Sequence, residues 1–97
     1  MIDYLKKYLS LEEFRVIELD FSTLDKYNFD ENEYNVTRVL DYLKSIGVVN
    51  FKDLLLDRKD ICFKDLDILK EEVSKIRQEL IVKIFNEDVS SLSNLNI

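Results

Sequence analysis

Gly47 is the only glycine in a chain of 97 residues that contains no proline. Glycine adopts positive φ at little cost, and helices commonly end on a glycine in the left-handed conformation. An amphipathic stripe of apolar residues over 36–46 runs directly up to Gly47. The sequence therefore predicts a helix over 36–46, a tight turn at Gly47, and a second short helix capped by Asn50.

The composition is that of one small globular domain. Apolar residues make up 46% of the chain, and a chain of this size buries roughly two-thirds of its unfolded surface. No stretch approaches the ~20 apolar residues of a membrane span, and the N-terminus lacks the order of a signal peptide. A single cysteine, Cys62, forms no internal disulfide. We expect a cytoplasmic protein, with Cys62 buried in the core.

Two short helices are expected near the N-terminus. Apolar residues over 2–9 follow the helical period, and Ser10 with Glu13 forms a capping box for a second helix. That helix would bury Leu11, Phe14 and Ile17. Residues 14–21 also suit a short strand, because they are rich in β-branched and aromatic side chains. A helix is favoured because no partner strand is evident.

A polar stretch over 25–35 is interpreted as a connecting loop, with Asn35 as the N-cap of the helix that follows. Beyond the Gly47 turn, the core resumes at 61–63, and one long helix is predicted from Leu66 to Ile84. Its apolar stripe consists of Leu66, Leu69, Val73, Ile76, Leu80 and Ile84. The predicted fold is a small all-α single-domain bundle. It has an acidic helical extension over 1–35 that packs on the core, a helical domain over 36–86 and a flexible tail over 87–97.

The segment Val36–Leu80 resembles the C-terminal domain of the bacterial RNA polymerase alpha subunit. The residues in register, without a gap, are Arg38, Leu40, Leu43, Lys44, Gly47, Val48, Asp53, Leu54, Lys64, Lys70, Val73, Ile76 and Leu80. The resemblance implies a compact helical fold with a helix-hairpin-helix element. It also implies binding to the DNA minor groove upstream of promoters and contact with transcription activators.

The resemblance places the family's key arginine on Arg38, and the asparagine that accompanies it on Asp41. Arg38 either pairs with Asp41 at i,i+3 or anchors a partner. The asparagine, glycine, lysine and serine of the family's second hairpin fall on residues of a different chemical kind. These are Asp67, Leu69, Glu71 and Glu72.

These departures disfavour DNA binding. A hairpin presents backbone N–H groups to a phosphate only where glycine allows close approach, and Leu69 carries a side chain there. Glu71 and Glu72 add negative charge where phosphates would lie. The net charge of -6 is also unevenly spread, because residues 1–34 carry nine acidic and four basic side chains.

No catalytic or metal-binding motif emerges. The chain has no histidine, which excludes Ser-His-Asp and Cys-His arrangements, and one cysteine cannot build a zinc site. The acidic runs 30–33 and 65–67 lack the spacing and glycine of an EF-hand, and there is no glycine-rich phosphate loop. We expect no enzyme activity, no cofactor and no metal.

The expected function is a protein–protein interaction module that binds a basic partner surface, such as a transcription component. Acidic residues 1–34 and the acid-substituted hairpin would form its recognition surfaces. The size and acidity also fit a small phage or mobile-element regulator. The alternative is a DNA-binding, transcription-associated domain using Arg38, Lys44, Lys52 and Lys70. Either a monomer or a homodimer is compatible with the sequence, a homodimer being favoured if 14–21 forms a strand.

Overall fold

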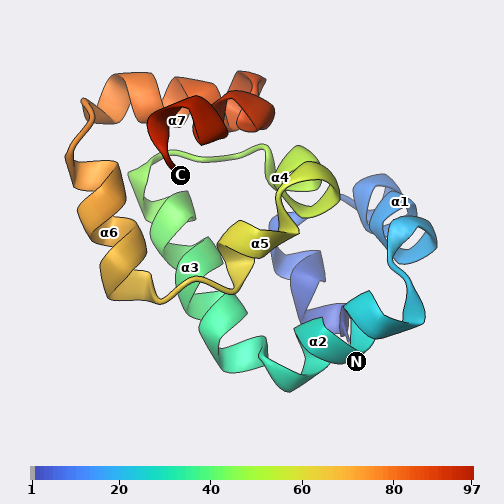
Figure 1. The fold of residues 1–97 in the computed structure, drawn as a ribbon. Helices are drawn as coiled ribbons and strands as arrows, with labels where there is room; N and C mark the ends of the chain where they lie inside the picture. The colour runs from blue at the N-terminus through green and yellow to red at the C-terminus, as the bar shows by residue number, and fades with distance from the viewer. Residues whose placement is uncertain (1) are drawn as a thin grey trace.

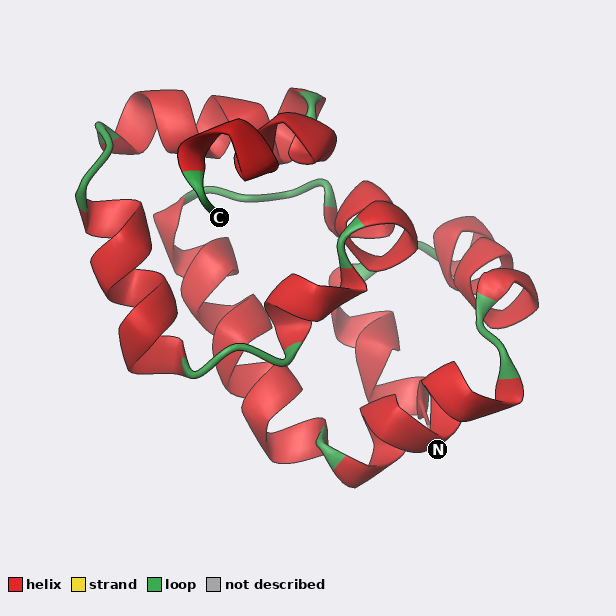
Figure 2. Cartoon of the chain, in the orientation of Figure 1, coloured by secondary structure: helices red, strands yellow, loops and turns green. Residues whose placement is uncertain are grey.

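The computed structural model describes residues 2–97, which consist of helices and short connections without a strand (Figures 1 and 2). The elements follow in the order η1 (Ile2–Tyr8), α1 (Leu11–Asp20), α2 (Thr23–Glu31), α3 (Glu33–Ile46), α4 (Phe51–Asp57), α5 (Lys59–Cys62), α6 (Leu66–Ser74), α7 (Gln78–Glu87) and η2 (Val89–Leu95). The prediction of an all-α fold is confirmed for these residues. Both η elements are 3-10 helices.

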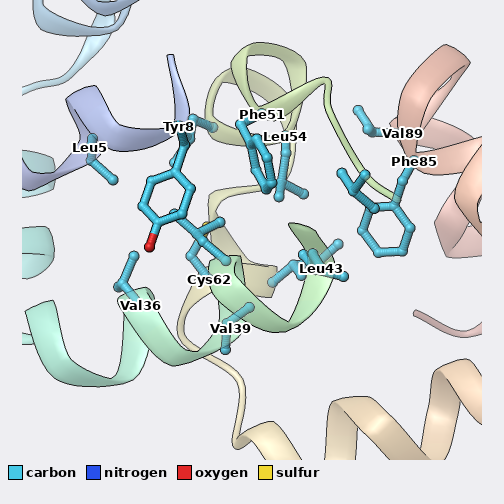
Figure 3. Packing of buried hydrophobic residues seen from close by; sticks show 14 of the residues in the cluster. Leu5, Tyr8, Val36, Val39, Leu43, Phe51, Leu54, Cys62, Phe85 and Val89 are labelled. Atoms are coloured by element: carbon cyan, nitrogen blue, oxygen red, sulfur yellow. The ribbon is translucent and has the colours of Figure 1, made fainter. Parts of the chain in front are cut away.

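Helix α3 is the longest element and lies at the centre of the packing. Its buried residues are those of the predicted stripe: Val36, Val39, Leu40 and Leu43. It packs against α2, α5 and α6. Side chains from η1, α4, α7 and η2 meet those of α3 in one continuous core, and Cys62 is fully buried there, as predicted (Figure 3).

The turn after α3 has the predicted conformation. Gly47 has φ +115°, and its N–H donates to the Lys44 carbonyl at 3.2 Å. The Val48 N–H donates to the Leu43 carbonyl at 3.0 Å. This pair of hydrogen bonds is the Schellman motif, and it satisfies two carbonyls that the end of the helix leaves open. Asn50 then caps α4 by accepting from the Asp53 N–H, as predicted.

Helix α1 begins at the predicted capping box. The Ser10 hydroxyl accepts from the Glu13 N–H, and the Glu13 carboxylate accepts from the Ser10 N–H. Because Leu11–Asp20 is helical, the alternative of a strand over 14–21 is wrong. Phe14 and Ile17 face the core, where α1 packs against α4 and η1. Leu11, expected in the core, is 62% exposed instead.

The predicted loop over 25–35 is wrong, because most of it belongs to α2 and the start of α3. Helix α2 begins at a second capping box formed by Ser22 and Asp25. Its only buried side chain is Phe29, which packs on Phe21 and Phe63 with ring centroids 4.7 and 4.8 Å away. With a single buried residue, the helix leaves no apolar stripe in the sequence.

Asn35 lies inside α3 and is not its N-cap. Its amide nitrogen donates to the carbonyls of Cys62 and Lys64, at 3.3 and 2.9 Å. These hydrogen bonds attach α3 to the turn after α5. The polar side chain that indicated a helix start therefore makes a tertiary contact.

The single long helix predicted from Leu66 to Ile84 is divided into α6 and α7 by a break at residues 75–77. Helix α6 buries the predicted residues Leu66, Leu69 and Val73. Helix α7 turns across the bundle and buries Ile81 and Phe85, leaving Leu80 47% exposed. Since no glycine or proline marks the break, the sequence pattern allowed a continuous helix.

In place of the flexible tail expected over 87–97, the structure has η2 packed against α7 and α4. Val89, Leu92 and Ile97 are buried. The Arg58 guanidinium binds Asp60 through two hydrogen bonds and donates to the Ile97 carbonyl at 2.6 Å. The last residues therefore contribute to the core.

No helix within residues 2–97 combines the length and the apolar character that a membrane span requires.

Candidate protein-binding surface

The turn between α3 and α4 is held by Asn86 of α7. The Asn86 Oδ1 accepts from the N–H groups of Val49 and Asn50 at 2.8 and 3.2 Å. Its Nδ2 donates to the Gly47 carbonyl at 3.2 Å, and the Asn50 side chain donates to the Asn86 carbonyl at 3.0 Å. All four N–H groups from Gly47 to Asn50 therefore donate to atoms of the protein itself.

This arrangement bears on phosphate recognition. A hairpin binds a phosphate through backbone N–H groups that point outward without an internal acceptor. The turn at Gly47 has no such group. Two of its four amides donate to the carbonyls of Lys44 and Leu43, and the other two donate to the Asn86 side chain. Sequence reasoning missed Asn86, since nothing local connects it with a turn 36 to 39 positions earlier in the chain.

Arg38 and Asp41 are both on α3, but they face different partners. The Arg38 guanidinium lies over the exposed ring of Tyr34, 5.5 Å from its centroid. Asp41 accepts from the Tyr8 hydroxyl at 2.6 Å and from the Lys7 ammonium at 3.0 Å. No ion pair joins Arg38 to Asp41 in the described structure, so the predicted i,i+3 pair is wrong.

The hydrogen bond from Tyr8 and the contact with Lys7 lower the pKa of Asp41. Burial and the neighbouring carboxylate raise the pKa of Tyr8. Asp41 therefore attaches η1 to α3 as a carboxylate, while Arg38 remains exposed and available to a partner.

The residues predicted at the second hairpin lie on α6 and differ in accessibility. Asp67 and Glu71 are exposed. Leu69 is fully buried, so the proposal that it belongs to a recognition surface is wrong. Glu72 is partly buried and forms an ion pair with Lys64 at 2.8 Å. Among these four residues, only Asp67 and Glu71 have an exposed carboxylate that forms no ion pair.

The N-terminal end of α6 is also occupied from within. The Asp65 carboxylate accepts from the N–H groups of Asp67 and Ile68 at 2.9 and 3.1 Å. A carboxylate at this position occupies the place that an anion would take at a helix N-terminus. The end of α6 therefore offers nothing to a phosphate.

The outer side of α1 carries large apolar side chains that nothing in the structure covers. Leu19 is 87% exposed, and Leu11 and Val16 are 62% and 45% exposed. Helical spacing places Leu11, Arg15 and Leu19 in one row, since residues four apart lie on the same side of a helix. Figure 1 shows α1 at the edge of the bundle, with its inner side against α4.

Helix α2, the next element along the chain, also exposes large apolar side chains, Leu24 and Tyr27. The same part of the chain is strongly acidic, because residues 11–31 contain seven acidic and two basic side chains. We refer to the outer side of these two helices as the α1–α2 surface. It comprises Leu11, Val16, Leu19, Leu24 and Tyr27 together with the carboxylates of Glu12, Glu18 and Glu31.

The carboxylates of this surface differ from the acids around them. Glu13 and Asp25 are held in capping boxes, and Asp20 pairs with Lys59 at 3.0 Å. Glu12, Glu18 and Glu31 take no part in the ion pairs found among residues 2–97. Their charge is therefore available to an external partner.

Several hollows lie on the surface of the molecule. One of about 390 Å³ is lined by Glu33, Tyr34, Thr37 and Arg38. Another of about 320 Å³ lies between α3, α6 and α7, beside Tyr42, Ile46, Val73, Ser74, Ile76 and Gln78. Within residues 2–97, no group of three or more Cys, Asp or Glu side chains is placed to hold a metal ion.

Comparison with protein-family models, with curated proteins and with solved structures gave no match. The assignment of a function therefore depends on the geometry of this chain. Sequence reasoning proposed the acidic N-terminal region as a recognition surface, but placed Leu11 in the core. It also assigned 25–35 to a loop, so the exposed apolar part of the α1–α2 surface was missed.

Proposed function

We propose that this chain is a protein-interaction module without catalytic activity, and that its α1–α2 surface binds a partner protein with a basic surface. The observation that carries this proposal is the coincidence of charge and apolar exposure. Residues 11–31 have a net charge of -5 in a chain of net charge -6. Five large apolar side chains are exposed along the same two helices.

Each property has a separate role in binding. Removing apolar area from water supplies affinity, at roughly 25 cal/mol per Å² before the costs of association. Opposite charge on the partner speeds association and selects against acidic proteins. A surface with both properties favours a partner whose apolar contact area is surrounded by lysine or arginine.

The test compares two triple variants with the same change in charge. Glu12→Gln/Glu18→Gln/Glu31→Gln neutralises the α1–α2 surface, and Glu71→Gln/Glu79→Gln/Glu87→Gln neutralises exposed acids of α6 and α7. Proteins captured from the native host by the wild type are identified, and the purified partner is titrated against all three forms. We expect the first variant to lose affinity about tenfold at physiological salt, and the second about twofold or less. Equal losses would contradict the proposal.

A transcription component is the partner class that the sequence resemblance favours. The helix–Gly47–helix unit of α3 and α4 is compatible with the helix-hairpin-helix element of the polymerase domain that the sequence resembles. A cytoplasmic location accords with such a partner. A small regulator from a phage or mobile element, acting on the host's machinery, would also use a surface of this kind.

DNA binding through Arg38, Lys44, Lys52 and Lys70 is the second candidate, because Arg38 is exposed. Two observations disfavour this candidate. The amides of the Gly47 turn have internal acceptors, and Glu71 adds negative charge next to Lys70 in the sequence. A gel-shift titration of duplex DNA at low and physiological salt tests it. Binding that weakens with salt and with Arg38→Ala would support it. Absence of binding at low salt would remove it.

A further inference from the structure

We infer that the partner segment that docks on α1 is an amphipathic α-helix whose apolar stripe is flanked by lysine or arginine. This inference rests on the proposed function and specifies the partner for the same surface. It follows from the shape of the exposed apolar row, from the secondary structure around it and from the position of its charges.

The secondary structure excludes one common mode of peptide binding. An extended peptide binds by adding a strand to the edge of a sheet. Residues 2–97 contain no strand, so this part of the chain offers no such edge. A partner therefore does not bind to this part of the chain by adding a strand.

The outer side of α1 has the form that helix packing requires. Leu11, Arg15 and Leu19 form a ridge of residues four apart, about 12 Å long at a rise of 1.5 Å per residue. Ridges of this spacing pack into the grooves of a second helix. Because Phe14 and Ile17 already bury the inner side, α1 is apolar on two sides.

The charges of α1 select the flanks of the partner helix. Helical spacing puts Glu18 on one side of the Leu11–Leu19 row and Glu12 on the other. Arg15 lies within the row, where its aliphatic stem adds apolar area. Cationic side chains on both flanks of the incoming stripe would meet Glu12 and Glu18.

The same charges disfavour two other occupants. A second copy of this chain would bring two segments of net charge -5 within a Debye length of about 8 Å. An anionic lipid surface would be repelled in the same way. A basic helix of another protein is the occupant that both the apolar row and the charges favour.

The experiment uses two synthetic peptides of identical leucine and lysine composition. One places leucine at helical spacing, and the other has a scrambled order without an apolar stripe. Each is titrated into the ¹⁵N-labelled full chain, and amide shifts are followed. We expect the amphipathic peptide to bind at least tenfold more tightly, with shifts concentrated on α1. Leu19→Ser should weaken it about tenfold or more, whereas Ile68→Ser, an equivalent change at an exposed site on α6, should change it less than twofold.

Three results would overturn the inference. These are equal binding of the two peptides, shifts that map away from α1, and a doubled mass in sedimentation that Leu19→Ser abolishes. Binding of the native partner to two variants distinguishes this inference from the proposed function. If the partner binds Leu19→Ser normally but is lost from the Glu12/Glu18/Glu31 variant, helix docking on α1 is wrong and the proposed function stands. If neither variant loses the partner, both are wrong.

Discussion

Gly47 illustrates how one residue can determine a turn for two reasons at once. Its φ of +115° strains any residue with a Cβ, and a Cβ at this position would lie 3.3 Å from Cγ1 of Val82. We expect Gly47→Ala to lower the free energy of unfolding by about 1–3 kcal/mol in urea titrations. In a Val82→Ala background the loss should be smaller but still present, because only the steric part is relieved. A loss below about 0.5 kcal/mol would show that the turn can relax.

Asn86 is a second residue on which the same turn depends. Its side chain accepts from two backbone amides and donates to one carbonyl across the α3–α4 turn. Asn86→Ala leaves these groups without their partner and should cost about 1–3 kcal/mol in urea titrations. Asn86→Asp keeps the acceptor and should cost less. Asn94→Ala, an exposed change on η2, is the control and should stay within about 0.5 kcal/mol. Equal losses for Asn86→Ala and Asn86→Asp would contradict this role.

At the scale of elements, η1 is attached to the bundle by two tyrosine hydroxyls with different acceptors. Tyr8 donates to the Asp41 carboxylate at 2.6 Å, and Tyr4 donates to the Phe29 backbone carbonyl at 2.7 Å. The lowered pKa of Asp41 means that its ionised form stabilises the fold. This contribution is complete above the unfolded pKa of about 4, and it is lost as the pH falls through the lower folded pKa.

Tyr8→Phe should therefore destabilise the protein by about 1 kcal/mol at pH 7, and by less at about pH 2.5. Tyr4→Phe is the matched control. Its hydroxyl binds a neutral carbonyl, so its cost should not change over the same acidic range. Urea midpoints of both variants and the wild type at the two pH values provide the measurement. A Tyr8→Phe cost that does not vary with pH would show that Asp41 is not coupled to this hydroxyl.

The elements differ in how far the sequence predicts them, and the reason is physical. Helix α3 and the caps at Ser10, Gly47 and Asn50 were predicted because a regular apolar stripe and local hydrogen bonds specify them. Helix α2 was missed because it buries Phe29 alone. The break between α6 and α7 was missed because no local signal marks it. Helix α6 buries Leu66, Leu69 and Val73, whereas α7 buries Ile81 and Phe85, and tertiary packing determines which apolar residues are buried.

At the scale of the whole molecule, the helical class was predictable from the sequence, whereas the contribution of the last residues to the core was not. The core includes Leu5 and Ile17 from the N-terminal extension and Leu92 from the expected tail, together with α3. The α1–α2 surface was only half predictable. Composition revealed its acidity, but the exposure of Leu11 and Leu19 depends on which side of α1 meets α4.

The buried thiol of Cys62 allows the opening of the fold to be followed by chemical labelling. The thiol is fully buried, and burial raises its pKa to about 12, so a thiol reagent at pH 8 encounters almost no thiolate. Labelling then requires the fold to open, and its rate reports the population of opened molecules. A ligand of the closed form at a hundred times its Kd should slow labelling about a hundredfold. The wild-type chain can thus report its own stability, and the capture of a partner, without an added probe.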